Sequence, residues 1–267
     1  MPRPPPYQPI SLQGQTVLIT GASAGIGEAC AWRFAEAGCN LILIARRTPR
    51  LVAIKQEITS EFPNLAVHTI TMDVRNTDAV IALPASLPHP VDILVNNAGL
   101  ALGIDAADQV DLDDAKTMFD CNVMATVVFT KSFGAIMRER NHGHIINMSS
   151  IAAREAYAGG SMYCATKHAV DALTVAARHD FVGTKVRVTS ISPGAVQTEF
   201  SVVRFKGDQG RADAVYHGIE PLTAADIADN VLYACTRPAH VQIADIMPLA
   251  TFQSSAKGLA RVLLEGS

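Results

Sequence analysis

The stretch from Thr20 to Gly27, T-G-A-S-A-G-I-G, constrains the fold of this chain more than any other. It follows an apolar, β-branched run at positions 16–19 and precedes apolar residues at helical spacing that start at Ile26. This order predicts a strand, a glycine turn and a helix. The segment is therefore expected to open a layered α/β fold.

The three glycines of this turn suggest a phosphate site. Gly21, Gly25 and Gly27 allow the backbone to approach a ligand closely, and the following helix directs unpaired N–H groups and a positive dipole end toward it. The stretch lacks the Lys-Ser/Thr ending of a P-loop, which argues against nucleotide hydrolysis. A dinucleotide pyrophosphate fits this pattern, and a simple tight turn is the alternative.

Composition limits the class of protein. With 267 residues, 49% hydrophobic and 18% charged, the chain fits one large α/β layer structure, expected over 15–267 after a proline-rich arm at 1–14. A net charge of -3 and 6% aromatic residues argue against nucleic acid as a partner. Small molecules are the expected partners.

Cysteine use and hydropathy predict the compartment. The five cysteines are an odd number without a C-x-x-C pair, so they predict neither a disulfide framework nor a zinc site. The first ten residues hold five prolines and no apolar core, unlike a signal peptide. No apolar run is long enough to span a membrane. The sequence therefore predicts a soluble, cytoplasmic protein.

Two adjacent arginines suggest which dinucleotide is bound. The run 40–45 predicts a second buried strand, and Arg46 and Arg47 follow it, 19 and 20 positions after Gly27. An acidic residue at this place bonds the ribose 2′-hydroxyl of NAD, whereas arginine suits the 2′-phosphate of NADP. Solvated surface cations are the alternative, but the spacing favours NADP.

Two further strands are predicted to end in polar residues. The run 66–71 ends before Asp73, whose carboxylate is expected either to accept from an adenine amino group or to cap a turn. The run 91–95 opens into Asn96 and Asn97. Because strands alternate with helices, parallel pairing brings these ends to one sheet edge, where ligands of such folds bind.

The middle of the chain contains a polar residue within a helix. Positions 111–138 predict one long helix, and Asn122 interrupts its apolar side. A buried asparagine must be hydrogen-bonded, either to a neighbouring carbonyl or, in the sharper hypothesis, to a catalytic water. His142 and His144 lack other ligands nearby, so they are interpreted as surface or turn histidines rather than as a metal site.

A tyrosine and a lysine four residues apart are the candidate acid/base pair. The strand at 143–148 ends at Ser149 and Ser150, and the helix expected over 163–181 begins with Tyr163 and Lys167. Residues at i and i+4 share a helix face, so the ammonium is expected to lower the pKa of the phenol. Such pairs are often only surface residues, but the nearby serine and the nucleotide turn favour catalysis.

The last third of the chain predicts a substrate region. A sixth strand at 186–191 leads to S-P-G at 192–194, and a long polar connection at about 198–221 is expected to be a lid or substrate loop. Thr223 and Asp226 form a capping box for a helix through Arg237, and 242–247 predicts the seventh strand.

Four motifs in order resemble the short-chain dehydrogenase/reductase family, over roughly 15–253: T-G-A-S-A-G-I-G, N-N-A-G at Asn96, Ser150 with Y-C-A-T-K at Tyr163, and S-P-G. The resemblance implies a Rossmann-type, doubly wound parallel sheet of seven strands in the order 3-2-1-4-5-6-7. It implies a catalytic set of Asn122, Ser150, Tyr163 and Lys167. In that scheme Ser150 orients the substrate oxygen, Tyr163 passes the proton, Lys167 bonds the nicotinamide ribose, and Asn122 holds a relay water.

The resemblance also implies a cofactor-binding set. Its expected members are Gly21, Ser23, Ala24, Gly25, Ile26, Gly27, Arg46, Arg47, Asp73, Val74, Asn96, Asn97, Tyr163, Lys167, Pro193, Gly194, Val196 and Thr198. Most members of the family are tetramers, so a homotetramer is expected, with the helices around Met118 and Val170 either at its interfaces or facing the core.

Four other stretches are similar to the NADP-dependent 3-hydroxy acid dehydrogenases, which also act on serine and allo-threonine. They begin at Asn96, Arg140, Thr198 and Pro238. The leading hypothesis is hydride transfer between NADP and the 3-hydroxyl carbon of a short 3-hydroxy acid. A carbonyl or 3-ketoacyl reductase and a non-catalytic NADP sensor are the alternatives.

An arginine on the substrate loop is the candidate for binding the acid group of the substrate. Arg204, Lys206 and Arg154 could all approach the mouth of the site. Arg204 is chosen, together with Ser150, as a substrate-binding residue, because its loop is long and follows the S-P-G turn. A solvated arginine is the alternative.

Overall fold

The computed structural model describes residues 8–261, and the strands within it form one parallel sheet. Their order is β3-β2-β1-β4-β5-β6-β7, as predicted. The strands are β1 (Thr16–Thr20), β2 (Asn40–Ala45), β3 (Val67–Thr71), β4 (Ile93–Asn96), β5 (Gly143–Met148), β6 (Val186–Ile191) and β7 (Asp245–Ile246).

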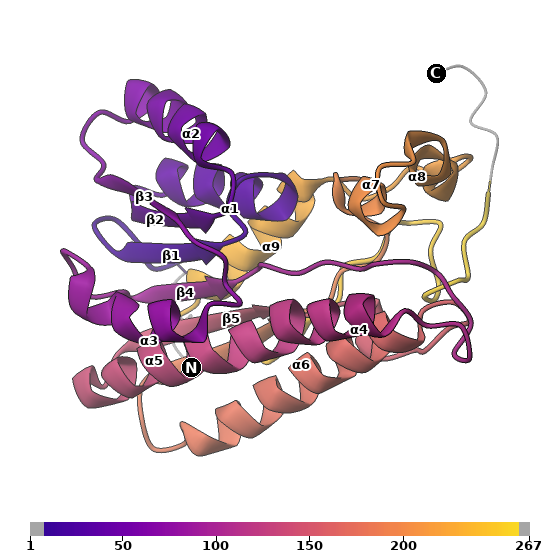
Figure 1. Cartoon of the computed structure of the whole chain (residues 1–267). Helices are drawn as coiled ribbons and strands as arrows, with labels where there is room; N and C mark the ends of the chain where they lie inside the picture. The colour runs from indigo at the N-terminus through magenta and orange to yellow at the C-terminus, as the bar shows by residue number, and fades with distance from the viewer. Residues whose placement is uncertain (1–7, 262–267) are drawn as a thin grey trace, which may run out of the picture.

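Helices cover both faces of this sheet (Figure 1). One face is covered by α1 (Gly25–Glu36), α2 (Thr48–Glu61) and α9 (Ala224–Cys235), and the other by α3 (Thr77–Ser86), α5 (Ala125–Arg140) and α6 (Ser161–Asp180). Residues on each strand alternate between the two sides, so Val17 and Ile19 pack in one core and Leu18 in the other. Burial on both faces explains the continuous apolar runs of the strands.

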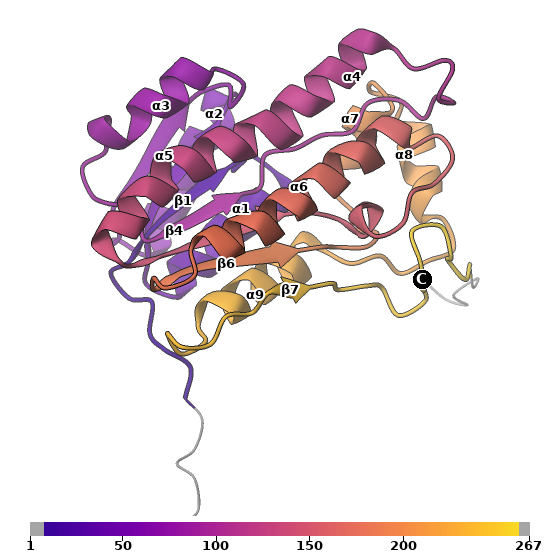
Figure 2. The same ribbon diagram turned by 90° about the horizontal axis from the view of Figure 1, so that it is seen from below.

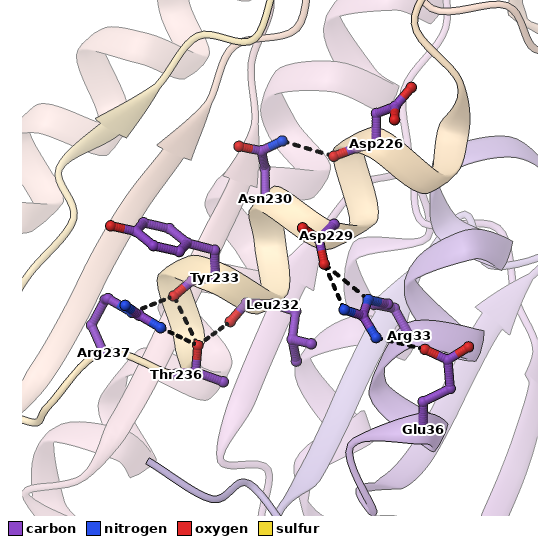
Figure 3. A network of polar contacts seen from close by, with 9 residues as sticks. All are labelled: Arg33, Glu36, Asp226, Asp229, Asn230, Leu232, Tyr233, Thr236 and Arg237. Carbon is purple, nitrogen blue, oxygen red and sulfur yellow. Dashed lines mark hydrogen bonds and ion pairs between the residues drawn. The ribbon is translucent and has the colours of Figure 1, made fainter. Parts of the chain in front are cut away.

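The helix that follows the substrate region returns to the first helix of the chain. The predicted capping box at the start of α9 is present, since Thr223 Oγ1 accepts from the N–H of Asp226 and the Asp226 carboxylate accepts from the N–H of Thr223. Arg33 of α1 donates to Asp229 of α9 at 3.0 and 2.6 Å, and Figure 3 shows these two side chains facing each other. This exposed pair contributes about 0–1 kcal/mol, so buried apolar contacts hold α9 on α1.

The predicted long helix at 111–138 contains a change of helix type. It consists of α4 (Leu112–Met118), a π-helical turn η1 (Phe119–Met124) and α5. The π turn contains Asn122, which is buried. π-helical turns occur frequently at functional sites, and periodicity of apolar residues does not reveal them.

Two predictions for the last third were wrong in detail. The connection at 198–221 is not a plain loop, because it contains α7 (Phe200–Arg204) and α8 (Gln209–Tyr216). The seventh strand is shorter than 242–247, because Gln242 bonds β6 through its side chain, with Oε1 accepting from the N–H of Val188 at 2.8 Å.

The described part of the predicted N-terminal arm contacts the rest of the domain. Leu12 is 2% exposed and packs in the core, and the N–H of Ile10 donates to the carbonyl of Thr236 at 2.9 Å. The part of the predicted arm at 1–7 lies outside the described residues. Residues 10–14 therefore belong to the folded body.

Short helices and connecting segments gather at one end of the molecule. Figures 1 and 2 show α4, α7, α8 and the C-terminal segment (residues 248–261) at this end, beyond the sheet. Pairing is parallel throughout, so the carboxyl ends of β1, β4, β5 and β6 share one edge. The predicted motifs follow these strand ends, as expected for an open α/β sheet.

Candidate active site

The glycine turn is shaped for close approach of a ligand. Gly21 has a φ of +67°, and a Cβ there would lie 2.9 Å from Ala98 Cα. A Cβ on Gly27 would collide with the carbonyl oxygen of Gly21. Helix α1 starts at Gly25 without a side-chain cap, so its first N–H groups are left for an anion. The turn thus has the features that a pyrophosphate requires.

The N-N-A-G motif holds this turn from the neighbouring strand. Asn97 Nδ2 donates to the carbonyls of Thr20 at 2.9 Å and Gly21 at 3.3 Å. Thr20 Oγ1 in turn accepts from the N–H groups of Asn97 and Ala98, both at 3.0 Å. Asn96 points into the core instead, where its Nδ2 donates to Asn147 Oδ1 at 2.8 Å. Thr20 is thus a positioning residue that the sequence analysis did not select.

The arginines after β2 lie beside the turn. Arg47 donates from Nε to Ser23 Oγ at 3.1 Å and from Nη2 to the Ser23 carbonyl at 3.2 Å. Its Nη1 also pairs with Glu199 at 2.9 Å. Arg46 is exposed, and Arg50 pairs with Glu28 at 3.0 Å. Arg47 and Arg50 therefore lie beside Ser23 of the glycine turn, and Arg50 and Glu199 were not predicted.

In this structure Asp73 caps a turn, which is one of the two roles predicted for its carboxylate. Its carboxylate accepts from the N–H and the guanidinium of Arg75, at 2.6–3.1 Å. The hydrogen bond from the Arg75 side chain is the main cause that lowers the pKa of Asp73, and Arg46 adds to the lowering. Val74, the next residue, is buried. An adenine contact at Asp73 remains a prediction.

Ser150, Tyr163 and Lys167 come together where β5 ends. Ser150 caps the short helix η2 (Ile151–Ala153), and its Oγ accepts from the N–H of Ala152 at 3.1 Å. Tyr163 and Lys167 occupy the first turns of α6, with Lys167 Nζ 5.8 Å from the Tyr163 ring centroid. Lys167 is 5% exposed and donates to the carbonyl of Met148 at 2.8 Å. The predicted i,i+4 geometry is confirmed.

The pKa values of the pair differ from the sequence expectation. Burial raises the pKa of Tyr163, although the hydrogen bond with Ser150 and the charge of Arg204 oppose the rise. Burial lowers the pKa of Lys167 to about 8. The expected net lowering of the tyrosine pKa by Lys167 is therefore not observed, because desolvation of the phenol outweighs the nearby charges.

The side chain of Asn122 is engaged on both of its polar atoms. Its Nδ2 donates to the Leu100 carbonyl at 2.8 Å and to Thr166 Oγ1 at 3.0 Å, and its Oδ1 accepts from the N–H of Leu100 at 2.8 Å. Both amide hydrogens are thus used. The predicted relay water could only donate to Asn122, at Oδ1 or at the backbone carbonyl.

The segment after β6 encloses the other side of the site. The carbonyl of Pro193 accepts from the N–H of Ile151 at 3.0 Å, and Val196 bridges to Leu222. A Cβ on Gly194 would collide with Gln253, and one on Gly25 would lie 3.2 Å from the side chain of Thr198. These contacts place the predicted residues of this segment between the glycine turn and the C-terminal segment.

Helix α7 faces the candidate catalytic tyrosine. Phe200 and Arg204 are one turn apart and share a helix face. The Phe200 ring meets the Tyr163 ring edge-on at 5.5 Å, and the Arg204 guanidinium lies 5.8 Å from the same ring centroid. Arg204 therefore lies beside the reacting region, as predicted.

The three candidate cations of the substrate region differ in their partners. Arg154 pairs with Asp171 at 2.6 Å and with Asp245 at 2.8 Å, and Lys206 pairs with Asp114 at 2.8 Å. Arg204 is half-buried, and among the described residues it donates to the carbonyls of Gly103 and Gly159 and to the Tyr157 hydroxyl, at 3.1–3.4 Å. No carboxylate within residues 8–261 pairs with it.

The histidine pair was partly misinterpreted. His142 is exposed, but His144 lies on β5 and is 2% exposed, with Nε2 2.8 Å from Thr189 Oγ1. Burial lowers the pKa of His144 well below its usual value, so it is a neutral core residue. Across the described range, no three His, Cys, Asp or Glu side chains are arranged to hold a metal ion.

Comparison with known proteins shows the family of this chain. Residues 15–209 match the short chain dehydrogenase family. The chain is 42% identical over 254 residues to an NADP-dependent 3-hydroxy acid dehydrogenase of Schizosaccharomyces pombe, covering 94% of this chain and 98% of that protein. It is 45% identical over 244 residues to the NADP-dependent 3-hydroxy acid dehydrogenase YdfG of Salmonella typhi, covering 90% and 96%.

A solved structure gives the same result in three dimensions. The closed form of a serine dehydrogenase complexed with NADP+ superposes with a TM-score of 0.87 at 43% identity, covering 91% of this chain and 97% of that chain. The protein belongs to the short-chain dehydrogenase family, which confirms the resemblance seen in its motifs.

Proposed function

We propose that this protein catalyses reversible hydride transfer between NADP(H) and the 3-hydroxyl carbon of short 3-hydroxy acids such as serine, allo-threonine and 3-hydroxypropionate. In the reverse direction it would reduce the corresponding semialdehyde. The observation that carries the proposal is the guanidinium of Arg204, which lies 5.8 Å from the Tyr163 ring and has no carboxylate partner among the described residues.

NADP is the cofactor named for the relatives of this chain, and the residues present fit it. The glycine turn leaves no room for side chains, the start of α1 has free N–H groups, and Arg46, Arg47 and Arg50 add positive charge beyond β2. A guanidinium binds a 2′-phosphate by charge-assisted hydrogen bonds, and NAD has no phosphate at this position. When bound, NADP supplies the hydride acceptor or donor.

The chain's own residues supply positioning and proton transfer. In the oxidation direction, Tyr163 takes the proton of the substrate hydroxyl while Ser150 holds that oxygen, and reduction reverses the transfer. Lys167 lies next to the phenol and favours its ionised form by charge. Asn122 is proposed to accept from a relay water. The adjacency of Ser150, Tyr163 and Lys167 supports these roles.

Arg204 retains capacity for the acid group of a substrate. A guanidinium has five N–H donors, and the three hydrogen bonds to Gly103, Tyr157 and Gly159 leave two. A carboxylate is the natural partner for a half-buried, unpaired guanidinium. A site built around such a pair rejects analogues that lack the charge, because the guanidinium then stays unpaired.

The test compares 3-hydroxypropionate with its neutral methyl ester, both with NADP+. The wild type should prefer the acid, and Arg204→Ala should raise KM for the acid about tenfold, as expected for losing a charged hydrogen bond of about 1.5–3 kcal/mol. The ester should change little. The control Lys206→Ala removes a neighbouring cation already paired with Asp114, so it should leave both substrates unaffected.

Other outcomes would identify the competing functions. A wild-type preference for the ester would indicate a general carbonyl or 3-ketoacyl reductase, and cofactor binding without turnover would indicate a sensor. Equal losses on acid and ester in Arg204→Ala would mean that Arg204 only ties α7 to the segments at Gly103 and Gly159.

We extend the proposal to compartment and assembly, as a cytoplasmic homotetramer. All five cysteines are free and buried, which suits a reducing compartment. No helix among residues 8–261 is long and apolar enough to cross a membrane. Met118 and Val170 are buried within the chain, at 3% and 1% exposed, which supports the core-facing alternative for these two side chains. Light scattering of the purified protein tests the assembly.

A further inference from the structure

The C-terminal segment, defined as residues 248–261, is held against the candidate site by three hydrogen bonds. The N–H of Gly194 donates to the Pro248 carbonyl at 2.9 Å, and the N–H of Ala195 to Gln253 Oε1 at 2.8 Å. The N–H of Ala256 donates to Glu155 Oε2 at 2.7 Å. The segment thus contacts both the loop after β6 and the loop before α6, although no motif of the family includes it.

These anchors place a second cation, Lys257, at the tyrosine ring that Arg204 also contacts. Lys257 Nζ lies 4.5 Å from the centroid of the Tyr157 ring. The guanidinium of Arg204 lies 5.7 Å from the same centroid, and its Nη1 donates to the Tyr157 hydroxyl at 3.1 Å. Tyr157 is therefore shared by two positive groups, one of which also lies over Tyr163.

Nearby carboxylates do not neutralise these two cations. Asp111 caps α4 by accepting from two backbone N–H groups, and Asp114 pairs with Lys206. Glu155 accepts from Ala256 and makes no ion pair with Lys257. Within residues 8–261, neither Arg204 nor Lys257 has a salt bridge.

Two like charges at one aromatic ring, without an anion between them, repel each other. Burial is the main cause that lowers the pKa of Lys257, and repulsion by the charge of Arg204 lowers this pKa further. The contact of both cations with the Tyr157 ring offsets part of the energetic cost of this repulsion. A bound anion would relieve the rest, and the hydroxy-acid substrates of the proposed function carry such a group.

We propose that Lys257 and Arg204 hold the acid group of the substrate between them, which makes Lys257 a specificity-determining residue of the site. The inference rests on the proposed function. Arg204 offers its two remaining N–H donors beside Tyr163, whereas Lys257, which is exposed, adds a point charge on a flexible stem beside Tyr157. The site therefore takes short hydroxy acids, and the C-terminal segment contributes to this choice.

The test uses the full-length protein with NADP+, 3-hydroxypropionate and its methyl ester. Lys257→Met should lower kcat/KM for the acid about fivefold or more, with less than about twofold change for the ester, because only the acid uses the charge. Lys257→Arg should keep most of the preference for the acid. Lys206→Met, which removes a lysine paired with Asp114, is the matched control and should change neither.

A double variant adds a readout that a structural role would not produce. If both cations bind one acid group, Arg204→Ala with Lys257→Met should lose less than the product of the single losses, since contacts to a shared group are not additive. Inhibition by propionate, used as a probe anion, should weaken in parallel with the loss on 3-hydroxypropionate.

The outcomes separate this inference from the proposed function. If the wild type prefers the acid and Lys257→Met keeps that preference in full, the inference is wrong and the proposed function stands. Equal losses on acid and ester, with no rescue by Lys257→Arg, would also overturn it. If the wild type itself does not prefer the acid, both fail.

Discussion

The cofactor side and the substrate side of this site are built differently. The glycine turn and its cations come from one continuous stretch, β1 to the start of α2, which Asn97 holds from the end of β4. The surroundings of Tyr163 come from four separate stretches, near Gly103, Tyr157, Arg204 and Lys257.

Because of this difference, the cofactor side and the substrate side tolerate amino-acid substitutions differently. In the cofactor side, backbone N–H groups and glycines make the binding surface, so most substitutions there would collide with backbone. In the substrate side, single side chains on connecting segments make the surface, and these can be exchanged without rebuilding the sheet. One fold can therefore keep its cofactor while its substrate varies.

The largest effect is expected at Tyr163, where loss of proton transfer can be measured separately from cofactor binding. Tyr163→Phe removes only the hydroxyl, so the helix face and the contact with Phe200 remain. Turnover should fall by about 10² to 10⁴, the usual contribution of general acid/base catalysis. Binding of NADPH, measured by fluorescence titration, should change little. Turnover near wild type in this variant would overturn the assignment of the proton donor.

A smaller effect is expected from substitutions on the cofactor side, which should change the use of NADP and leave substrate preference unchanged. Replacing both Arg46 and Arg47 by Ala should lower kcat/KM for NADP about tenfold or more, by loss of charged hydrogen bonds to the 2′-phosphate, and leave NAD nearly unchanged. The ratio of acid to ester turnover should stay constant. Initial rates with both cofactors measure this.

The salt bridge between Arg47 and Glu199 provides the control for that experiment. Glu199→Gln removes a carboxylate that pairs with Arg47 at 2.9 Å and leaves the arginines in place. It should keep or increase the preference for NADP, because one anion competing for Arg47 is gone. A wild type that used NAD as efficiently as NADP would contradict the role of both arginines.

The smallest effect concerns the helix that joins the two sides. Thr223→Ala removes the cap of α9, which follows the substrate region and packs on α1. The free energy of unfolding should fall by about 1 kcal/mol, with unchanged kcat, because the cap is remote from the reacting groups. Urea denaturation measures it, and Thr223→Ser is the control that keeps the hydroxyl. Loss of substrate preference in Thr223→Ala would show that α9 also positions the substrate region.

Regular elements and local motifs were predictable from the sequence. The glycine turn, the strands 143–148 and 186–191, the capping box at Thr223 and the i,i+4 pair of Tyr163 and Lys167 each depend on residues close together in the chain. Periodicity and short-range hydrogen bonds determine such features. The order of the strands came from the family resemblance, which the sheet confirms.

Tertiary structure alone decided which polar groups meet. Sequence could not tell that Arg154 and Lys206 have acidic partners while Arg204 has none within residues 8–261, because those partners lie on other elements of the fold. It also gave the wrong direction for the pKa of Tyr163, since desolvation depends on the packing of distant segments around the ring. Local order is set by neighbours in sequence, whereas charge and burial at a site are set by what the fold brings beside it.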